Sequence, residues 1–481
     1  MLETATPTEV SQDRASGLLP ARILEIEISQ PLDTLSAIDE VTGTYYARAY
    51  CMIRLHTQPL GMIEVPFSNG KASPQAYAPR IWDVFADQIR QHLQRDGLPL
   101  PASLDTSGLP FLELPLCLKE REAFLAHAPF VSVIVPTRDH PQCLADCLSA
   151  LVKLQYPCYE ILIVDSAPTT TATADLIRQF YSDDPRVRYL VNKQPGASRA
   201  RNLGIMEAKG EILAFTDDDA VVDVHWLTEL VRAFGRAKRV VCVTGSVSPL
   251  RVDTLAQLWF ATYFRGMGDR AKMRRIFSPE IVESHLYYRH LMGNLGGSVN
   301  MAATAAFLRH IGGFDPALGP GTPTQAAEDV EVFIHANMHG GTYVYEPAAL
   351  VYHLDRPDFA GVEKQIHGYG LSVLAVLLKC IAQYPSIALH FMKHVFSRLF
   401  FFIRAEGRPK KSPKKNLSAE AAAPKWGELL GWEGEKRATK RIMRQLLSGI
   451  CGGPLALIKS TVIQRNKREV RSNRKSSIPL W

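Results

Sequence analysis

The sequence predicts an α/β protein: a mainly parallel sheet flanked by helices, with a small β-rich domain before it and a helical, basic region after it. Three observations support this prediction. Strand-length apolar segments alternate with amphipathic, helix-length segments from residue 129 to residue 358, which is the pattern of consecutive βαβ units. Segments before residue 97 combine alternating polarity with β-branched and aromatic residues, which favours strands. Lysine and arginine concentrate after residue 404, so this region needs an explanation of its own.

These patterns divide the chain into six regions. We expect a disordered segment at 1–20, a small α+β domain of unassigned role at 21–97, a proline-rich linker at 98–128, the main α/β domain at 129–358, apolar or amphipathic helices at 359–403 and a basic tail at 404–481. The tail contains 19 Lys/Arg and 6 Asp/Glu, a net charge of +13 in a chain whose total is +7. The rest of the chain is therefore acidic.

The N-terminal domain is expected to contain three strands, at 22–28, 45–55 and 62–67, and then a helix at 78–94. The helix is predicted because its apolar residues recur at helical spacing. The segment 58–61 contains Pro and Gly and predicts a turn between the last two strands. We identify no chemistry in this domain.

The main domain is expected to alternate strand and helix throughout. The predicted strands are 130–138, 159–165, 187–191, 212–215, 240–247, 342–347 and 350–353. The predicted helices are 142–154, one ending at 180, 197–208, 225–238, one ending at 310 and one beginning at 328. Right-handed βαβ connections between such strands give a sheet that is mainly parallel.

Three carboxylates, Asp217, Asp218 and Asp219, directly follow the apolar strand 212–215. Adjacent carboxylates in a half-buried site repel one another, and a cation would neutralise them. Residues two apart in an extended segment point the same way, so Asp217 and Asp219 can share one target. Oxygen ligands suit Mg²⁺ or Mn²⁺ carrying a substrate phosphate. The alternative interpretation is a solvated acidic turn.

Polar groups also end two other predicted strands. Pro136, Thr137 and Arg138 end the first strand of the domain, and Asp165 ends the second. Ligands of open α/β sheets bind at the carboxyl ends of the strands, where Asp165 could accept a hydrogen bond from a base or a ribose. Asp165 could instead cap the loop that follows it.

Two further groups of charged residues lie on predicted helices. Arg199, Arg201 and Asn202 lie on the helix that enters the aspartate strand, facing either a nucleotide or solvent. Glu328 and Asp329 begin a later helix, where the helix dipole by itself favours carboxylates. No G-x-G-x-x-G segment follows a predicted strand, which argues against an NAD or FAD site.

Composition gives expectations about the compartment. The eight cysteines include no C-x-x-C pair, and we interpret them as free thiols in a reducing compartment. The N-terminus has no basic segment followed by an apolar core, so no signal peptide is predicted. No apolar run is long enough to span a bilayer. We expect a cytoplasmic protein, peripheral at the inner face of the membrane if its basic tail binds lipid.

An ordered set of segments resembles the family 2 glycosyltransferases of the GT-A fold, over about residues 129–355. The segments are 131–137, 160–165, Pro-Gly-Ala-Ser-Arg-Ala-Arg-Asn at 195–202, 210–219, Trp-Leu at 226–227, Gly-Gly-Phe-Asp at 312–315, Glu-Asp at 328–329 and Val-Tyr-His at 351–353. The resemblance implies an inverting transfer of one sugar from a nucleotide-diphosphate sugar. The acceptor would be a hydroxyl of a glycan, a lipid-linked precursor or a secondary metabolite.

The resemblance also implies roles for individual residues. Asp329 would be the catalytic base, and Asp217, Asp219 and His353 would hold Mn²⁺ or Mg²⁺, with Asp219 as the main ligand. A histidine after a strand is also often structural, so this alternative stays open for His353. The implied nucleotide-sugar contacts are Pro136, Thr137, Arg138, Asp165, Arg199, Asn202, Asp217 and Glu328.

The sequence departs from the family at two positions. Asp218 stands where the family commonly has a small residue, and Ser166 follows Asp165 where many members have a second aspartate. We assign no role to Asp218, and the second departure leaves nucleoside recognition less defined.

The chemistry requires the same groups without reference to the family. A divalent cation stabilises the charge on a departing nucleoside diphosphate, and one carboxylate accepts the proton of the acceptor hydroxyl. A single displacement inverts the anomeric centre, whereas retention would need a second, nucleophilic carboxylate. The sequence offers no good candidate for that second group.

The C-terminal region leaves two interpretations open. Apolar helices at 371–381 and 387–403 with the basic tail would suit an anionic membrane surface, through residues 387–481. Alternatively, a helix packs on the main domain and the tail is solvated. The tail lacks interleaved aromatic residues, which argues against nucleic acid.

Two other functions are weighed against a glycosyltransferase. A nucleotidyltransferase would use a similar metal–carboxylate site, but no Gly-rich phosphate loop bearing Lys or Arg follows the first strand of the main domain. A non-catalytic, membrane-associated adaptor would use the tail alone. The Q-x-x-R-W segment of processive family members is absent from the sequence, which favours transfer of a single sugar.

Overall fold

The computed structural model describes residues 19–264, 273–279 and 296–384, and seven residues between 444 and 456. The predicted disorder before residue 19, the predicted helix at 387–403 and nearly all of the basic tail therefore lie outside the described residues. Among those that are described, no helix is both long enough and apolar enough to cross a bilayer.

A nine-stranded sheet forms the centre of the main unit, in the order β10-β14-β11-β13-β9-β6-β7-β8, with β12 paired to β14. The strands are β6 (Val131–Thr137), β7 (Tyr159–Ser166), β8 (Val187–Asn192), β9 (Ile212–Phe215), β10 (Ala220–Val222), β11 (Val240–Pro249), β12 (Arg275–Phe277), β13 (Met301–Thr304) and β14 (Thr342–His353). The pairings give β6, β7, β8, β9, β11 and β14 a common direction, and β10, β12 and β13 run against them. The predicted mainly parallel α/β sheet is confirmed.

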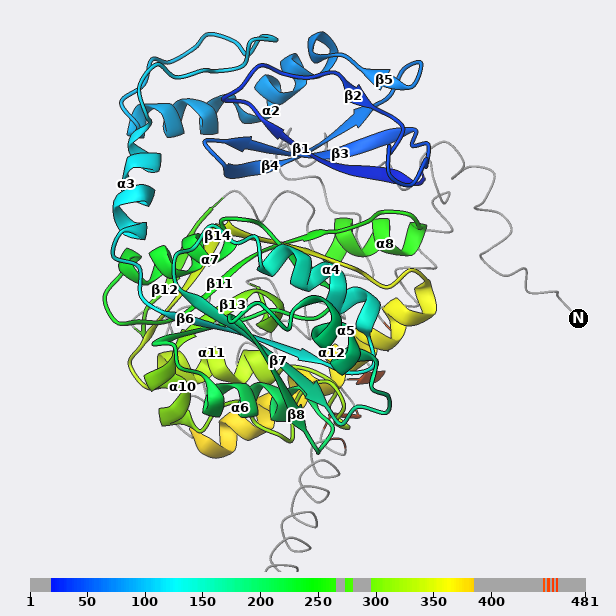
Figure 1. Ribbon diagram of the computed structural model, residues 1–481, viewed down its shortest axis with the longest axis vertical. Helices are drawn as coiled ribbons and strands as arrows, with labels where there is room; N and C mark the ends of the chain where they lie inside the picture. Colours follow the sequence, from blue (N-terminus) through cyan, green and yellow to red (C-terminus); the bar gives the residue numbers. More distant parts are fainter. Residues whose placement is uncertain are drawn as a thin grey trace, which may run out of the picture.

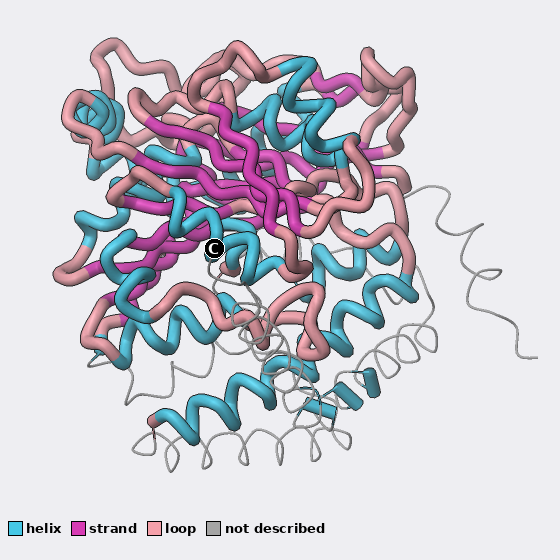
Figure 2. The backbone as a smooth tube through the Cα atoms, turned by 60° about the horizontal axis from the view of Figure 1, so that its bottom comes forward, coloured by secondary structure: helices cyan, strands magenta, loops and turns pink. Residues whose placement is uncertain are grey.

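Helices cover both faces of this sheet (Figures 1 and 2). On one face lie α4 (Pro141–Leu151), α5 (Ala172–Phe180) and α7 (Trp226–Arg232); on the other lie α6 (Ala197–Glu207), α10 (Ala305–Ile311) and α11 (Glu328–Met338). Strand β6 is buried at every position, with Val133 facing the first layer and Ile134 the second. Strands covered on both faces need such continuous apolar sequence. Helix α12 (Phe359–Gln383) packs against α11 and contains the predicted apolar segment 371–381.

The predicted small β-rich N-terminal unit is also present. Strands β1 (Ala21–Glu27), β3 (Arg48–Leu55) and β4 (Gln58–Pro66) form one sheet, and β2 (Leu35–Ser36) and β5 (Lys71–Ala72) form a second, short pair. Helix α2 (Pro74–Arg95) covers the three-stranded sheet with its apolar face.

The predicted turn at 58–61 is wrong, because β4 already begins at Gln58. The turn is made by His56 and Thr57, which both have positive φ, at 52° and 67°. The Glu27 carboxylate accepts hydrogen bonds from both backbone N–H groups, at 3.0 and 2.7 Å. A carboxylate from another strand thus stabilises a turn that has neither Gly nor Asn at its centre.

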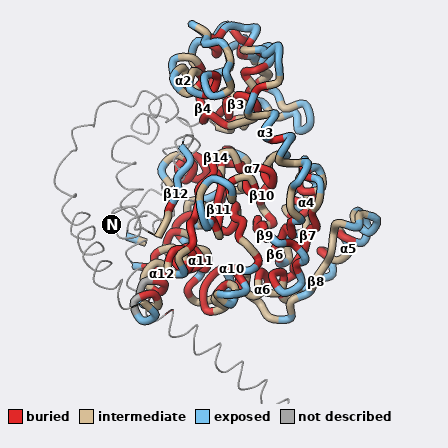
Figure 3. The backbone as a smooth tube through the Cα atoms, turned by 90° about the vertical axis from the view of Figure 1, so that its left-hand side faces the viewer, coloured by how far each residue is buried: buried red, intermediate tan, exposed pale blue. Residues whose placement is uncertain are grey.

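The segment predicted as a linker, 98–128, contains helix α3 (Leu116–Leu125), which runs from the N-terminal unit to the main unit (Figures 1 and 3). Arg121 of α3 donates to Glu229 of α7 at 3.1 Å, and both side chains are buried. The three-stranded sheet also packs against the main unit, with Met52 in the same apolar cluster as Leu350. Arg54 pairs with Asp223 at 2.6 Å across this contact. The two units therefore share a buried interface.

Candidate active site

The carboxyl ends of three neighbouring parallel strands, β9, β6 and β7, meet at one edge of the large sheet. Thr137 at the end of β6 lies opposite Asp165 at the end of β7, and β9 ends two residues before Asp217. The polar groups that the sequence places at strand ends are therefore brought to the same edge, where open α/β sheets bind their ligands.

Asp219 meets His353 because β10 pairs antiparallel with the end of β14. Ala220 lies opposite His353 in this pairing, which sets His353 Nε2 at 3.2 Å from Asp219 Oδ1. Ligand atoms of Asp217, Asp219 and His353 all lie within 4.8 Å of one another. The structure thus gathers the three residues expected to hold a metal, although His353 is far from the aspartates in sequence.

The donor atoms of this cluster fit a divalent cation. Asp355 Oδ1 lies 3.1 Å from His353 Nδ1, so with a cation bound the ring proton would stay on Nδ1 and the lone pair of Nε2 would be available to the metal. Within the described residues, the buried Oδ1 atom of Asp219 makes no hydrogen bond. A carboxylate behind a ligating histidine is the usual way to fix its tautomer. Two carboxylates and an imidazole nitrogen suit Mn²⁺ better than Mg²⁺.

Burial and charge act in opposite directions on Asp219. Burial disfavours its ionised form, but the neighbouring His353 and Arg356 outweigh this and lower its pKa. Asp219 is therefore ionised under ordinary conditions, which is the state that binds a metal.

Arg201 connects the two acidic groups of the site. It is 2% exposed, and its guanidinium donates to Asp217 Oδ1 at 2.8 Å and to Glu328 Oε1 at 2.7 Å. Such a fork holds both carboxylates in fixed orientation. Arg201 was not among the predicted site residues, and only the placement of α6 shows that it lies on the sheet side of this helix, as does Gly204, whose added Cβ would lie 2.5 Å from Ile134.

Asp329 lies beside this network at the start of α11. Its Oδ2 atom accepts from the Ser298 N–H at 3.0 Å, and its Oδ1 atom accepts from the Val330 N–H at 2.7 Å. Burial raises its pKa, although these backbone donors act the other way. Glu328 is 3% exposed and faces Arg201; burial raises its pKa as well.

Asp218 has a partner that the sequence did not suggest. It accepts from the Thr137 hydroxyl at 2.6 Å, and His140 Nδ1 lies 3.5 Å away. Burial raises the pKa of Asp218 to about 6. Thr137 and Asp218 together join the end of β6 to the turn that carries Asp217 and Asp219.

Asp165 lies at the same edge but is completely buried. Tyr189 donates to its Oδ2 atom at 2.9 Å, and its Oδ1 atom has no hydrogen-bond partner among the described residues. A nucleoside could reach this oxygen only if neighbouring groups move. Burial raises the pKa of Asp165.

The remaining residues that were predicted to contact a nucleotide sugar differ in exposure and in the hydrogen bonds they already make. Arg138 is exposed at the end of β6, and Pro136 is buried within it. Arg199 donates to Gln194 at 2.6 Å. The Asn202 amide binds the backbone of Phe314 on both sides, donating to its carbonyl at 2.7 Å and accepting from its N–H at 2.8 Å. Asn202 therefore positions the loop after α10, and its contact with a nucleotide stays a prediction.

Comparison with known proteins gives one family match and partial matches to curated relatives. Residues 132–306 match the family described as glycosyl transferase family 2. The glycosyltransferase AglE of Haloferax volcanii is 37% identical over 102 residues, which is 21% of this chain and 33% of that protein. The O-antigen biosynthesis protein RfbC of Myxococcus xanthus is 39% identical over 106 residues, which is 21% of this chain and 8% of that protein. The matches therefore span a third or less of these curated relatives.

Among solved structures, the mannosyltransferase PcManGT from Pyrobaculum calidifontis, in complex with GDP-Man and Mn²⁺, is similar with a TM-score of 0.38 and 18% identity. The match covers 72% of this chain and 93% of that chain.

Proposed function

We propose that this chain, whose residues 132–306 match glycosyl transferase family 2, moves one sugar from a nucleoside-diphosphate sugar to an acceptor hydroxyl with inversion. The observation that carries the proposal is the clustering of Asp217, Asp219 and His353 within 4.8 Å, next to the buried Arg201–Glu328 pair and Asp329. Two carboxylates and an imidazole that could hold a metal, together with the buried guanidinium of Arg201, would stabilise the negative charge of a diphosphate leaving group.

Asp219 and His353 would hold a divalent cation, with Asp217 as a further ligand through the oxygen that Arg201 does not bind. This cation would supply Lewis-acid stabilisation of the charge on the departing diphosphate. Arg201 fixes Asp217 on one side and Glu328 on the other, so it sets the distance between these two carboxylates.

Asp329 would serve as the general base. Two backbone N–H groups hold its carboxylate, and burial raises its pKa, which makes it a stronger base than an exposed aspartate. It would accept the proton of the acceptor hydroxyl as that oxygen attacks the anomeric carbon. One base and one displacement give inversion.

The acceptor we favour is a growing cell-envelope glycan or its lipid-linked precursor. The similarity to a protein named for O-antigen biosynthesis supports this class. Residues 387–481 would then attach the protein to anionic lipid, because the tail carries a net charge of +13. Sedimentation with anionic liposomes tests this attachment: binding by charge falls as salt rises, and salt-insensitive binding would contradict it.

Product analysis tests the activity. Purified protein is screened for thermal stabilisation by UDP-, GDP- and dTDP-sugars with Mn²⁺, and the stabilising donor is then incubated with acceptor candidates. Release of a nucleoside diphosphate is the expected result. Release of pyrophosphate would instead identify a nucleotidyltransferase, and a protein stabilised by no donor would contradict the proposal.

A further inference from the structure

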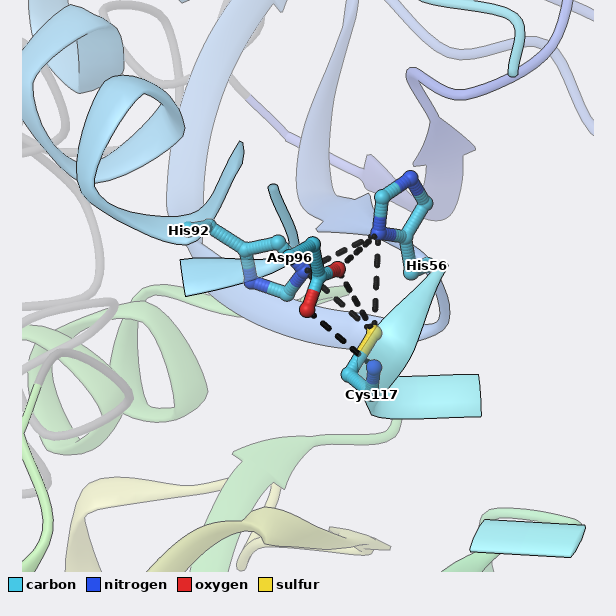
Figure 4. A group of neighbouring side chains, drawn as sticks. All are labelled: His56, His92, Asp96 and Cys117. Carbon is cyan, nitrogen blue, oxygen red and sulfur yellow. Dashed lines mark hydrogen bonds and ion pairs between the residues drawn. The ribbon is translucent and has the colours of Figure 1, made fainter. Parts of the chain in front are cut away.

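Four side chains that the active site does not use converge inside the N-terminal unit (Figure 4). His56 comes from the turn between β3 and β4, His92 and Asp96 from the end of α2, and Cys117 from the start of α3. The side chains of His56, His92 and Asp96 are 0%, 4% and 5% exposed. No sequence signal pointed to this group, because its members are spread over about 60 residues with no motif spacing.

The distances among the four facing atoms are those of a compact tetrahedron. His56 Nδ1 lies 3.0 Å from His92 Nε2, and Asp96 Oδ2 lies 2.9 Å from His56 Nδ1 and 3.3 Å from His92 Nε2. Cys117 Sγ lies 3.6 and 3.7 Å from the two nitrogens and 2.9 Å from Asp96 Oδ2. Tetrahedral zinc has bonds of about 2.0–2.1 Å to nitrogen and about 2.3 Å to sulfur. At tetrahedral angles these bonds give edges of about 3.3 Å for N–N or N–O and about 3.6 Å for S–N or S–O. Five of the six observed distances lie near these values, and the Sγ–Oδ2 distance, 2.9 Å, is shorter.

Hydrogen bonds alone explain this convergence poorly. All six edges of the group are short, but two neutral imidazoles and a thiol offer at most three protons between them. His56 Nδ1 alone faces three heteroatoms and has a single in-plane proton or lone pair. One central cation satisfies all four atoms at once.

The surrounding backbone holds these side chains in place. His56 has a positive φ of 52°, a conformation that is strained for a non-glycine residue, and the Glu27 carboxylate stabilises it through the backbone. The Asp96 Oδ1 atom accepts from the Cys117 N–H at 3.1 Å, which orients the carboxylate as metal sites usually do. His92 and Asp96 are four residues apart and so share one face of α2.

We propose that His56 Nδ1, His92 Nε2, Asp96 Oδ2 and Cys117 Sγ form a structural Zn²⁺ site that joins the β3–β4 turn, α2 and α3. The ligand set mixes nitrogen, sulfur and oxygen, which suits Zn²⁺ and not Mg²⁺. Four protein ligands fill a tetrahedral shell, so the metal has a structural role. On binding, the Cys117 thiol releases its proton to solvent. Because Arg121 of α3 contacts Glu229 of the main unit, the metal also stabilises the connection between the units.

The prediction of free thiols is confirmed for the cysteines that the structure describes, and the proposed site would add a ligand role for Cys117. The seven cysteines that the structure describes form no disulfide, but Cys117 has ligand-type neighbours. The inference does not depend on the proposed activity.

Metal content and spectroscopy test the site in the full-length protein. The purified chain is dialysed against metal-free buffer, and bound zinc is measured by plasma mass spectrometry; about one Zn²⁺ per chain is expected. Protein refilled with Co²⁺ should show the intense visible bands of tetrahedral geometry and a thiolate-to-cobalt charge-transfer band. Prolonged treatment with a strong chelator should lower Tm by on the order of 5–10 °C.

Matched variants locate the metal. Cys117→Ser and His92→Gln should lose the bound zinc, and Cys117→Ser should remove the charge-transfer band. Cys158→Ser, at a partly buried cysteine outside the group, should keep both. Asp219→Asn should also keep both, which separates this site from the active site.

Three results would overturn the proposal. The first is a wild-type chain that binds no zinc when Zn²⁺ is supplied in excess. The second is bound Co²⁺ without a sulfur charge-transfer band. The third is zinc binding that survives in a folded Cys117→Ser variant. Because the first two use the unaltered protein, a variant that fails to fold leaves the test intact.

Discussion

The part of the chain that the structure describes contains two groups of metal-binding type, and they differ in almost every physical respect. Asp217, Asp219 and His353 are partly exposed and lie at a sheet edge, where a substrate phosphate can complete the coordination of a metal. The group of His56, His92, Asp96 and Cys117 lies inside the N-terminal unit, and its four protein ligands leave no open position. The difference teaches that donor type and openness, more than the number of carboxylates, separate a reactive site from a structural one.

The largest effect is expected for Asp219→Asn. Removing the carboxylate that faces His353 should lower kcat by on the order of 10³ or more, because charge stabilisation on the leaving group is lost. The unfolding free energy should change little. Sugar transfer and denaturant unfolding are measured together, with Asp146→Asn on the exposed side of α4 as control. Undiminished sugar transfer would show that Asp217, Asp219 and His353 do not form a catalytic metal site.

Asp329→Asn should lower kcat by about 10²–10⁴, since the general base is lost, while donor binding is retained. In the wild type, burial raises the pKa of Asp329, so kcat/KM should fall with decreasing pH at values above the ordinary aspartate range. The stability contribution has the opposite sign: it is present in full below the unfolded pKa and is lost as pH rises through the raised folded pKa. A pH–rate profile in which Asp329→Asn keeps the acid limb would exclude this role.

Arg201→Met should destabilise the protein by about 3–5 kcal/mol, because it leaves Asp217 and Glu328 without their buried partner. Adding Glu328→Gln should restore part of that loss, since one uncompensated charge is then removed. Urea unfolding measures both effects, and Arg199→Ala on the same helix serves as the control. A wild-type midpoint for Arg201→Met would show that solvent already compensates the carboxylates.

The smallest effect is expected for Asp355→Asn. Its carboxylate fixes the ring of His353 from behind, so the variant should raise the Mn²⁺ concentration for half-maximal activity by about tenfold. Activity at saturating Mn²⁺ should be nearly that of the wild type, and the zinc content of the N-terminal unit should not change. A loss of kcat that Mn²⁺ does not restore would mean that Asp355 acts on more than the metal ligand.

Several features of the active site were predictable because they are local. The aspartates follow an apolar strand directly, and Asp165 ends another, so strand periodicity and the parallel sheet place them at one edge. Two features were not predictable in this way. Arg201 was indistinguishable from its neighbour Arg199 until helix α6 was placed against β6, and Asn202 has a backbone partner 112 residues away.

The N-terminal unit shows more clearly how far local sequence predicts structure. Its strands and helix follow from alternation and helical spacing, but its turn was placed at the Pro–Gly segment instead of at His56 and Thr57. The positive φ of these two residues depends on the Glu27 carboxylate, which comes from a different strand. A turn stabilised by a distant side chain has no local sequence signal.

The sequence by itself determined the alternation of strands and helices, the match of residues 132–306 to a glycosyl transferase family and the carboxylates at the strand ends, because each depends on neighbours in the chain or on a fixed period. Only the tertiary structure decided that Arg201 is a buried bridge, that His353 meets Asp219, and that four scattered side chains converge in the N-terminal unit. Those contacts join residues far apart in sequence, and they form only when packing of apolar faces brings their elements together.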